Sequence, residues 1–118
     1  MSVTITKLPI TRKQILAEGT ITADGTEQTV IEASGIMNLE GYIDLSQMTN
    51  GDTVTLRRYV KIQKNTEYKL HGEETYVGAQ AQPLIRFPAI ASYYGIKITL
   101  KQTSGTYKNF PYQFFKEA

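Results

Sequence analysis

His71 is the single histidine of this 118-residue chain, so any triad of serine, histidine and acid would have to use it. No serine lies in the G-x-S-x-G setting that presents a nucleophile at a sharp turn. The surrounding residues, Leu70-His71-Gly72, are more typical of the start of a turn than of a catalytic position. We therefore expect no nucleophilic catalysis.

The adjacent carboxylates Glu73 and Glu74 are the next candidates, because glycosidases act with a pair of carboxyl groups. Neighbours in a strand point to opposite faces, so these two could not face one sugar, and a solvated loop is the simpler interpretation. Their spacing to His71 matches no metal site. Asp24 and Asp52 flank glycines, where turn capping explains them, and no D-x-D-x-D-G calcium pattern occurs. Since no glycine motif for phosphate or dinucleotide occurs either, we expect no metal ion, no cofactor and no enzymatic activity.

The composition is that of one globular domain, with 41% hydrophobic and 20% charged residues. The chain has no cysteine, which excludes disulfides, thiolate metal sites and cysteine nucleophiles. The formal charge of +2 gives no general attraction to nucleic acid or to membranes. No apolar run is long enough for a signal peptide or a membrane span, so a soluble, cytoplasmic protein is the default expectation.

Alternation of apolar and polar residues between glycines is the strongest structural signal. The run 95–101 alternates without interruption, as a half-buried antiparallel strand does. In the run 53–62 only Arg58 interrupts the apolar face, which a position at a sheet edge or an outward-turning bulge would explain. Strands are expected at 18–23, 27–33, 39–45, 53–63, 67–71, 75–80, 95–103 and 106–115.

Eight such strands without covering helices predict an all-β fold, a sandwich of two antiparallel sheets. Residues 81–94 contain Pro83 and Pro88 and are expected to form a long crossing connection. A late crossing connection is what Greek-key or jelly-roll wiring requires.

Residues 1–14 have no obvious place in this sandwich and predict an extended N-terminal arm or strap, followed by a single domain at 15–118. The segment either packs along its own domain or reaches a neighbouring subunit. A single helical turn over 11–17 is an alternative for its end.

The aromatic run 107–115 closes the chain, and its Tyr112 and Phe114 share one strand face and are expected to complete the core. Phe110 and Phe115 then remain for a bulge, for the end of the domain or for a neighbour. Exposed phenylalanines beside Pro111 would be unusual in a monomer, which favours oligomerisation. The candidate partner-binding residues are Val3, Ile5, Leu8, Ile10, Phe110 and Phe115.

The adjacent pair Tyr93 and Tyr94 is a second candidate surface. Exposed, the two rings could form an aromatic platform for a ligand, most plausibly a carbohydrate, although the chain has no tryptophan. Packed, they would form the corner that leads into the strand at 95–103.

Basic side chains could line one sheet face and, with interleaved tyrosines, would then be similar to a surface for single-stranded nucleic acid. Acidic residues are nearly as abundant, and alternating lysines also protect sheets against aggregation, so nucleic-acid binding is not expected. The residues concerned are Arg57, Tyr59, Lys61, Lys97, Lys101, Tyr107 and Lys108.

The arm at 1–14, the cysteine-free sandwich rich in Thr, Gly and Tyr, and the phrases GYIDLS at 41–46 and GDTVTL at 51–56 resemble small jelly-roll proteins of virus particles. These include decoration and capsid-stabilising proteins of tailed phages and related viruses, and the resemblance covers most of the chain. It implies a homo-oligomer, with a trimer favoured, that the arm fixes to a capsid or other virion protein. We therefore expect a non-enzymatic virion protein, assembled in the host cytoplasm, that docks on or stabilises a capsid shell. The alternative is a sandwich module that binds a carbohydrate or another ligand.

Overall fold

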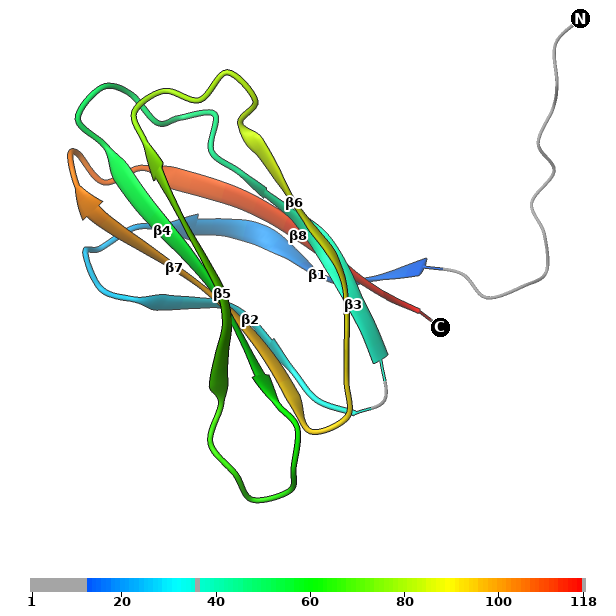
Figure 1. Cartoon of the computed structure of the whole chain (residues 1–118). Coiled ribbons are helices and arrows are strands. Elements are labelled where there is room, and N and C mark those ends of the chain that lie inside the picture. The colour runs from blue at the N-terminus through cyan, green and yellow to red at the C-terminus, as the bar shows by residue number, and fades with distance from the viewer. Residues whose placement is uncertain (1–12, 36, 118) are drawn as a thin grey trace, which may run out of the picture.

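Eight strands in two facing sheets make up the computed structural model, which describes residues 13–35 and 37–117 (Figure 1). The strands are β1 (Lys13–Thr22), β2 (Gln28–Ala33), β3 (Met37–Asp44), β4 (Thr53–Lys61), β5 (Lys69–Val77), β6 (Leu84–Ser92), β7 (Gly95–Ser104) and β8 (Asn109–Glu117). Sheet A has the strand order β1-β8-β3-β6, and sheet B has the order β2-β7-β4-β5. Successive strands change sheet except at the β4–β5 hairpin, which is jelly-roll wiring. The predicted two-sheet antiparallel sandwich is confirmed.

The core lies between the sheets and consists of the inward side chains of both. Sheet A contributes Leu39, Ile43, Phe87, Phe110 and Phe114, and sheet B contributes Val54, Leu56, Ile96, Ile98 and Leu100. Each of these side chains is at most 1% exposed. Burying one of them stabilises the fold by about 1.5–3 kcal/mol relative to leaving it in water. The alternation predicted at 95–101 is therefore confirmed.

A single strand, β5, takes the place of the two strands predicted at 67–71 and 75–80. Gly72, which reads as a break, lies inside β5 opposite Arg58. A Cβ atom at Gly72 would lie 2.0 Å from a guanidinium nitrogen of Arg58. This glycine makes room for a neighbouring side chain and not for a turn, so the prediction of two strands is wrong.

β6 lies inside 81–94, so the prediction of a long connection there is wrong. β6 is an edge strand of sheet A, and its register against β3 shifts between Leu39 and Gly41. Pro88 lies in the bulge that this shift creates. Proline is tolerated there because a bulge interrupts the ladder and an edge strand has a neighbour on one side only.

The chain is already extended at Lys13, where β1 begins, so a helical turn over 11–17 is wrong for the part that the structure describes. Lys13 and Gln14, which belong to the predicted arm, pair with the end of β8. Val3, Ile5, Leu8 and Ile10 of the predicted arm lie outside the described residues. Within 13–35 and 37–117 no helix is long and apolar enough to cross a membrane.

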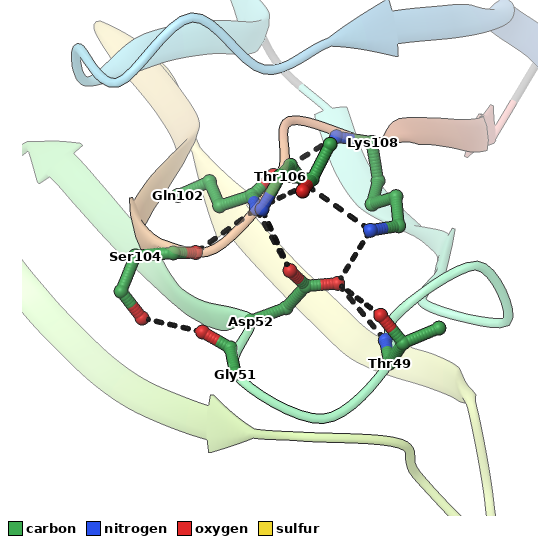
Figure 2. A network of polar contacts seen from close by, with 7 residues as sticks. All are labelled: Thr49, Gly51, Asp52, Gln102, Ser104, Thr106 and Lys108. Carbon is green, nitrogen blue, oxygen red and sulfur yellow. Dashed lines mark hydrogen bonds and ion pairs between the residues drawn. The ribbon is translucent and has the colours of Figure 1, made fainter.

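A buried carboxylate, Asp52, joins the β3–β4 and β7–β8 connections at one end of the sandwich (Figure 2). Its Oδ2 accepts a hydrogen bond from the Thr49 amide at 2.9 Å and lies 3.0 Å from Lys108 Nζ. Its Oδ1 accepts one from the Thr106 amide at 3.1 Å and lies 3.5 Å from Gln102 Nε2. The hydrogen bond from Thr49, together with Lys108, lowers the pKa of Asp52 although burial opposes the charge. Asp52 is therefore a structural group that holds two connections together.

Candidate interaction surfaces

His71 lies within β5, so the turn predicted there is wrong. It is the extra residue of a bulge, because the pairing of β4 with β5 shifts between Arg58 and Tyr59. Among the described residues, no group of three or more His, Cys, Asp or Glu side chains could hold a metal ion. The absence of enzymatic activity stays a prediction.

Glu73 and Glu74 lie on opposite faces of β5, as predicted, but they belong to a strand and not to a solvated loop. On the outer face of sheet B, Glu73 accepts a hydrogen bond from Arg57 Nε at 2.6 Å. On the inner face, Glu74 accepts two from Arg58, at 2.6 and 2.8 Å. Each carboxylate is paired with a different arginine, so the two do not face a common substrate.

Arg58 remains on the inner face of sheet B, where its guanidinium carbon lies 5.9 Å from the centre of the Phe87 ring. β4 is an inner strand and the neighbouring bulge does not turn Arg58 outward, so both explanations offered by the sequence are wrong. The bidentate pair with Glu74 and the face of Phe87 together accommodate an arginine at the margin of the core.

The outer face of sheet B is organised around Glu27, just before β2. This carboxylate accepts hydrogen bonds from Arg57 Nη1 at 3.0 Å, from the Tyr59 hydroxyl at 2.5 Å and from Thr99 Oγ1 at 2.6 Å. Partial burial alone would raise the pKa of Glu27, but the hydrogen bonds from Thr99 and Tyr59 and the charge of Arg57 outweigh it and lower the pKa. Glu27 thereby links residues of β4 and β7, and Arg57 extends the link to Glu73 of β5.

Lysines and tyrosines of the same face bind one another. The Lys97 ammonium lies 5.0 Å from the ring centre of Tyr59 and 4.8 Å from that of Tyr68, and Lys61 lies 4.5 Å from Tyr68. The Tyr68 hydroxyl donates to Glu32 at 2.9 Å. Burial and this hydrogen bond raise the pKa of Tyr68 to about 12. Most polar groups of this face therefore have partners within the chain.

The predicted basic face is only partly assembled. Arg57, Tyr59, Lys61 and Lys97 do share the outer face of sheet B, and Lys101 alternates onto it. Lys108 instead binds Asp52 at the end of the sandwich. The Tyr107 hydroxyl lies over Gly25, where a Cβ atom would approach it to 2.4 Å. Carboxylates neutralise Arg57, and the ammonium groups of Lys61 and Lys97 lie over tyrosine rings, so part of the positive charge of this face is already engaged within the chain.

The outer face of sheet A has two hollows that share Tyr42. The first, of about 300 Å³, lies beside Lys13, Glu40, Arg86 and Phe115. The second, of about 390 Å³, is lined by Asp44, Leu84, Pro111, Tyr112 and Gln113. Together they extend across sheet A from the start of β1 to the start of β6. This face therefore offers concave, partly apolar surface that residues 13–35 and 37–117 do not fill.

Two exposed aliphatic side chains lie at opposite margins of these hollows. Ile15 of β1 is 55% exposed and pairs with Phe115, and Leu84 of β6 is 57% exposed. Charged groups flank Ile15, since Lys13 Nζ lies 2.8 Å from Glu40 Oε1 and 3.1 Å from Glu117 Oε1. An apolar band with a charged rim is the usual composition of a protein interface.

The two phenylalanines predicted to bind a partner lie in different environments. Phe110 is fully buried between the sheets, so its assignment to a partner-binding surface is wrong. It shares the inward face of β8 with Tyr112 and Phe114, and Pro111 does not interrupt the alternation. Phe115 faces outward, is half-buried and borders the first hollow of sheet A. Its role in binding stays a prediction.

Tyr93 and Tyr94 form the turn between β6 and β7, at the end of the sandwich away from Asp52 (Figure 1). Their side chains are 56% and 39% exposed, so the prediction of a packed corner does not describe them. The ring centres are 4.8 Å apart with an angle of 47° between the planes. Their role as a ligand platform stays a prediction.

Several surface residues were not found by sequence reasoning. Glu27 joins groups that are 30, 32 and 72 residues away, which no local pattern shows. Tyr42 and Leu84 come together only when β6 is placed beside β3. The sequence does indicate that Tyr42 faces outward in β3, because Leu39 and Ile43 face inward and side chains alternate along a strand.

No protein-family model matches this chain, and neither does any curated protein. Among solved structures, a chain in the structure of infectious bursal disease virus, Gt strain, is similar with a TM-score of 0.51 and 12% identity over 92% of this chain. Chains of the Gx strain, and of the infectious bursal disease virus VP2 subviral particle, give TM-scores of 0.48 and 0.49 at 12% identity, over 99% and 92% of this chain. This chain spans only 32–35% of the length of those chains. The likeness to the Gt-strain chain shows a shared β-sandwich fold.

Proposed function

We propose that this protein is a non-enzymatic structural component of a virus particle that docks on or stabilises a capsid shell. The observation that carries the proposal is a difference between the outer faces of the two sheets of the jelly roll. Most polar groups on the outer face of sheet B have partners within the chain, whereas the outer face of sheet A presents two hollows. Both faces expose aliphatic side chains, Leu70 and Val77 on sheet B and Ile15 and Leu84 on sheet A, so it is the hollows that distinguish sheet A. The shared fold with a chain of infectious bursal disease virus supports the viral assignment.

The contact would form by burial of the outer face of sheet A against another protein. Apolar surface removed from water contributes about 25 cal/mol per Å², and a stable interface takes about 800 Å² from each partner. The band from Ile15 through Phe115 and Tyr42 to Leu84 crosses four strands and offers surface of this kind. We propose that the first contact is with other copies of the chain in a trimer, and that the second is with the shell.

The N-terminal segment would supply the attachment to the shell. It precedes Lys13, which lies at the first hollow of sheet A. Its residues include Val3, Ile5, Leu8 and Ile10, whose burial against a neighbour, or addition as a strand, would fix the subunit.

The test compares the full chain with a chain that lacks residues 1–12, by light scattering and by co-sedimentation with purified particles of the virus that encodes it. We expect the full chain to form a trimer and to sediment with the particles, and the shortened chain to remain a folded β protein that no longer does so. A full chain that stays monomeric and never sediments with particles would overturn the proposal. A shortened chain that assembles and docks normally would remove the N-terminal segment from it.

A further inference from the structure

We propose that the β6–β7 turn is a carbohydrate-binding platform, in which the rings of Tyr93 and Tyr94 stack on a sugar. This site lies at the opposite end of β7 from Asp52 and is separate from the outer face of sheet A. The proposal does not depend on the proposed role in a virus particle.

The two rings are exposed to solvent and packed against each other at an angle, so that the outward part of each ring is available to a ligand. Their centres are 4.8 Å apart at 47°, and the side chains remain 56% and 39% exposed. Tyrosine combines an apolar ring face with a hydroxyl at its rim, which suits a ligand with alternating C–H faces and hydroxyl groups. Neither ring is needed to complete the core, which closes with Phe87 and Phe114.

The backbone of the turn is fixed by its neighbours. The Gly35 amide donates to the Tyr93 carbonyl at 2.7 Å, which ties the turn to the β2–β3 connection. Ser92 Oγ accepts from the Gly95 amide at 3.2 Å. The same hydroxyl lies 3.1 Å from the Gly95 carbonyl and 3.2 Å from the Lys61 carbonyl, to either of which it can donate. A platform held in this way loses little conformational entropy on binding.

The residues around the β6–β7 turn do not cover the rings of Tyr93 and Tyr94. The Tyr68 side chain occupies the space beside Gly95, where a Cβ atom would lie 2.6 Å from the Tyr68 hydroxyl. The pairing of Lys61 with Gly95 brings Ile62, which is 79% exposed, to one side of the turn. The β2 strand pairs on the other side of β7 and ends just before the exposed Ser34. The two strands that pair with β7 are thus followed by an exposed apolar residue on one side and by an exposed serine on the other.

The size of the patch selects the class of ligand. Tyr93, Tyr94 and Ile62 together expose on the order of 300 Å² of side chain. A stable protein interface needs about 800 Å² from each partner, so the patch is too small for one. It matches the face of one or two sugar rings, which is why we assign it to a carbohydrate and not to a protein.

The first experiment is to screen the full chain on an array of immobilised glycans that carry terminal galactose, N-acetylglucosamine, mannose, fucose and sialic acid. Saturation-transfer NMR with the free glycan then measures binding. We expect binding by the unaltered chain, with magnetisation transferred from tyrosine ring protons to the protons of the sugar ring. Binding to no glycan on the array would overturn the proposal.

Variants locate the site. Tyr93→Ala and Tyr94→Ala should each weaken binding by roughly tenfold, because each removes one stacking ring. Tyr107→Ala is the matched control, since Tyr107 is 54% exposed at the other end of β7, and it should leave the Kd unchanged. Tyr93→Phe, which keeps the ring, should retain most of the affinity.

Folding of each variant is checked by its NMR spectrum. If an alanine variant does not fold, contacts between the rings of Tyr93 or Tyr94 and the sugar in the unaltered chain decide the question. Equal binding by the Tyr93→Ala/Tyr94→Ala double variant, or contacts only to Tyr107, would overturn the proposal.

Discussion

On the outer face of sheet B, Glu27 accepts hydrogen bonds from Arg57, Tyr59 and Thr99, whereas on the outer face of sheet A Tyr42 and Phe115 border hollows that the described residues leave empty. Both faces belong to four-stranded antiparallel sheets that close the same core. Since the backbone is alike, the difference lies in the outward residues alone. A sheet face whose polar groups bind one another gains little from a partner, and a face with exposed apolar hollows gains more.

The largest expected effect separates the two faces of β8. Phe110→Ala should destabilise the fold by about 3–5 kcal/mol, because it leaves a cavity in the core. Phe115→Ala removes a half-buried ring from the outer face of sheet A and should cost the isolated chain about 1 kcal/mol. Urea unfolding of both variants measures this. Equal losses would mean that Phe115 belongs to the core and not to the surface of sheet A.

The next comparison removes one carboxylate from each outer face. Glu27→Ala leaves Arg57, Tyr59 and Thr99 without their acceptor and should destabilise the chain by about 2 kcal/mol. Glu40→Ala removes a half-buried carboxylate that has one ion-pair partner, the exposed Lys13, and should change stability by about 0.5 kcal/mol. The urea midpoints decide. A Glu40 variant as unstable as the Glu27 variant would contradict the contrast between the faces.

A third pair of variants places a negative charge on either side of the β5–β6 connection, one at the start of the edge strand β6 and one at the end of the edge strand β5. Leu84→Asp, on sheet A, should weaken self-association by roughly tenfold, because a carboxylate would be buried in the contact. Val77→Asp, on sheet B, is the matched control, since its side chain is 69% exposed and that of Leu84 is 57% exposed. Concentration-dependent light scattering reports the dissociation constant. A stronger effect of Val77→Asp would move the contact to sheet B.

The smallest effect concerns acid. The pKa of Glu27 is lowered in the folded chain, so its stabilisation is present above the unfolded-state pKa and is lost as the pH falls through the lower folded-state pKa. Stability should therefore decline below about pH 4.3, and Glu27→Gln should reduce this decline. Glu117 on sheet A also has a lowered pKa, through its hydrogen bond with Lys13, but it is exposed, so Glu117→Gln should alter the decline less. Urea unfolding between pH 7 and 3 provides the measurement, and identical curves for both variants would refute it.

Much of the fold could be predicted from the sequence, because local alternation determines which side chains face inward. The runs at 53–61 and 95–104 show this, and so does the jelly-roll wiring in outline. β6 was missed because Pro88 is compatible with a strand only at an edge or a bulge, and neither is known before the strand order. Gly72 suggests a turn for a related reason: the space that it leaves is filled by the Arg58 side chain of the neighbouring strand, which the sequence alone does not show.

The candidate surfaces were less predictable. Phe110 could have been placed correctly, because it alternates with Tyr112 and Phe114, and only Pro111 argued otherwise. Glu27 could not, because its partners come from β4 and β7. The exposure of Tyr93 and Tyr94 depends on a turn whose anchors, Gly35 and Ser92, lie in different parts of the chain.

Pro88 also affects whether the molecule could assemble into fibres by pairing of sheet edges. It has no amide hydrogen to offer an incoming strand, and the bulge around it spoils the regular spacing that a strand would need. Edge-to-edge polymerisation of sheet A is therefore blocked on the β6 side. At high local concentration, where chance collisions between strand edges are frequent, the chain is thereby hindered from extending into an open ribbon through β6.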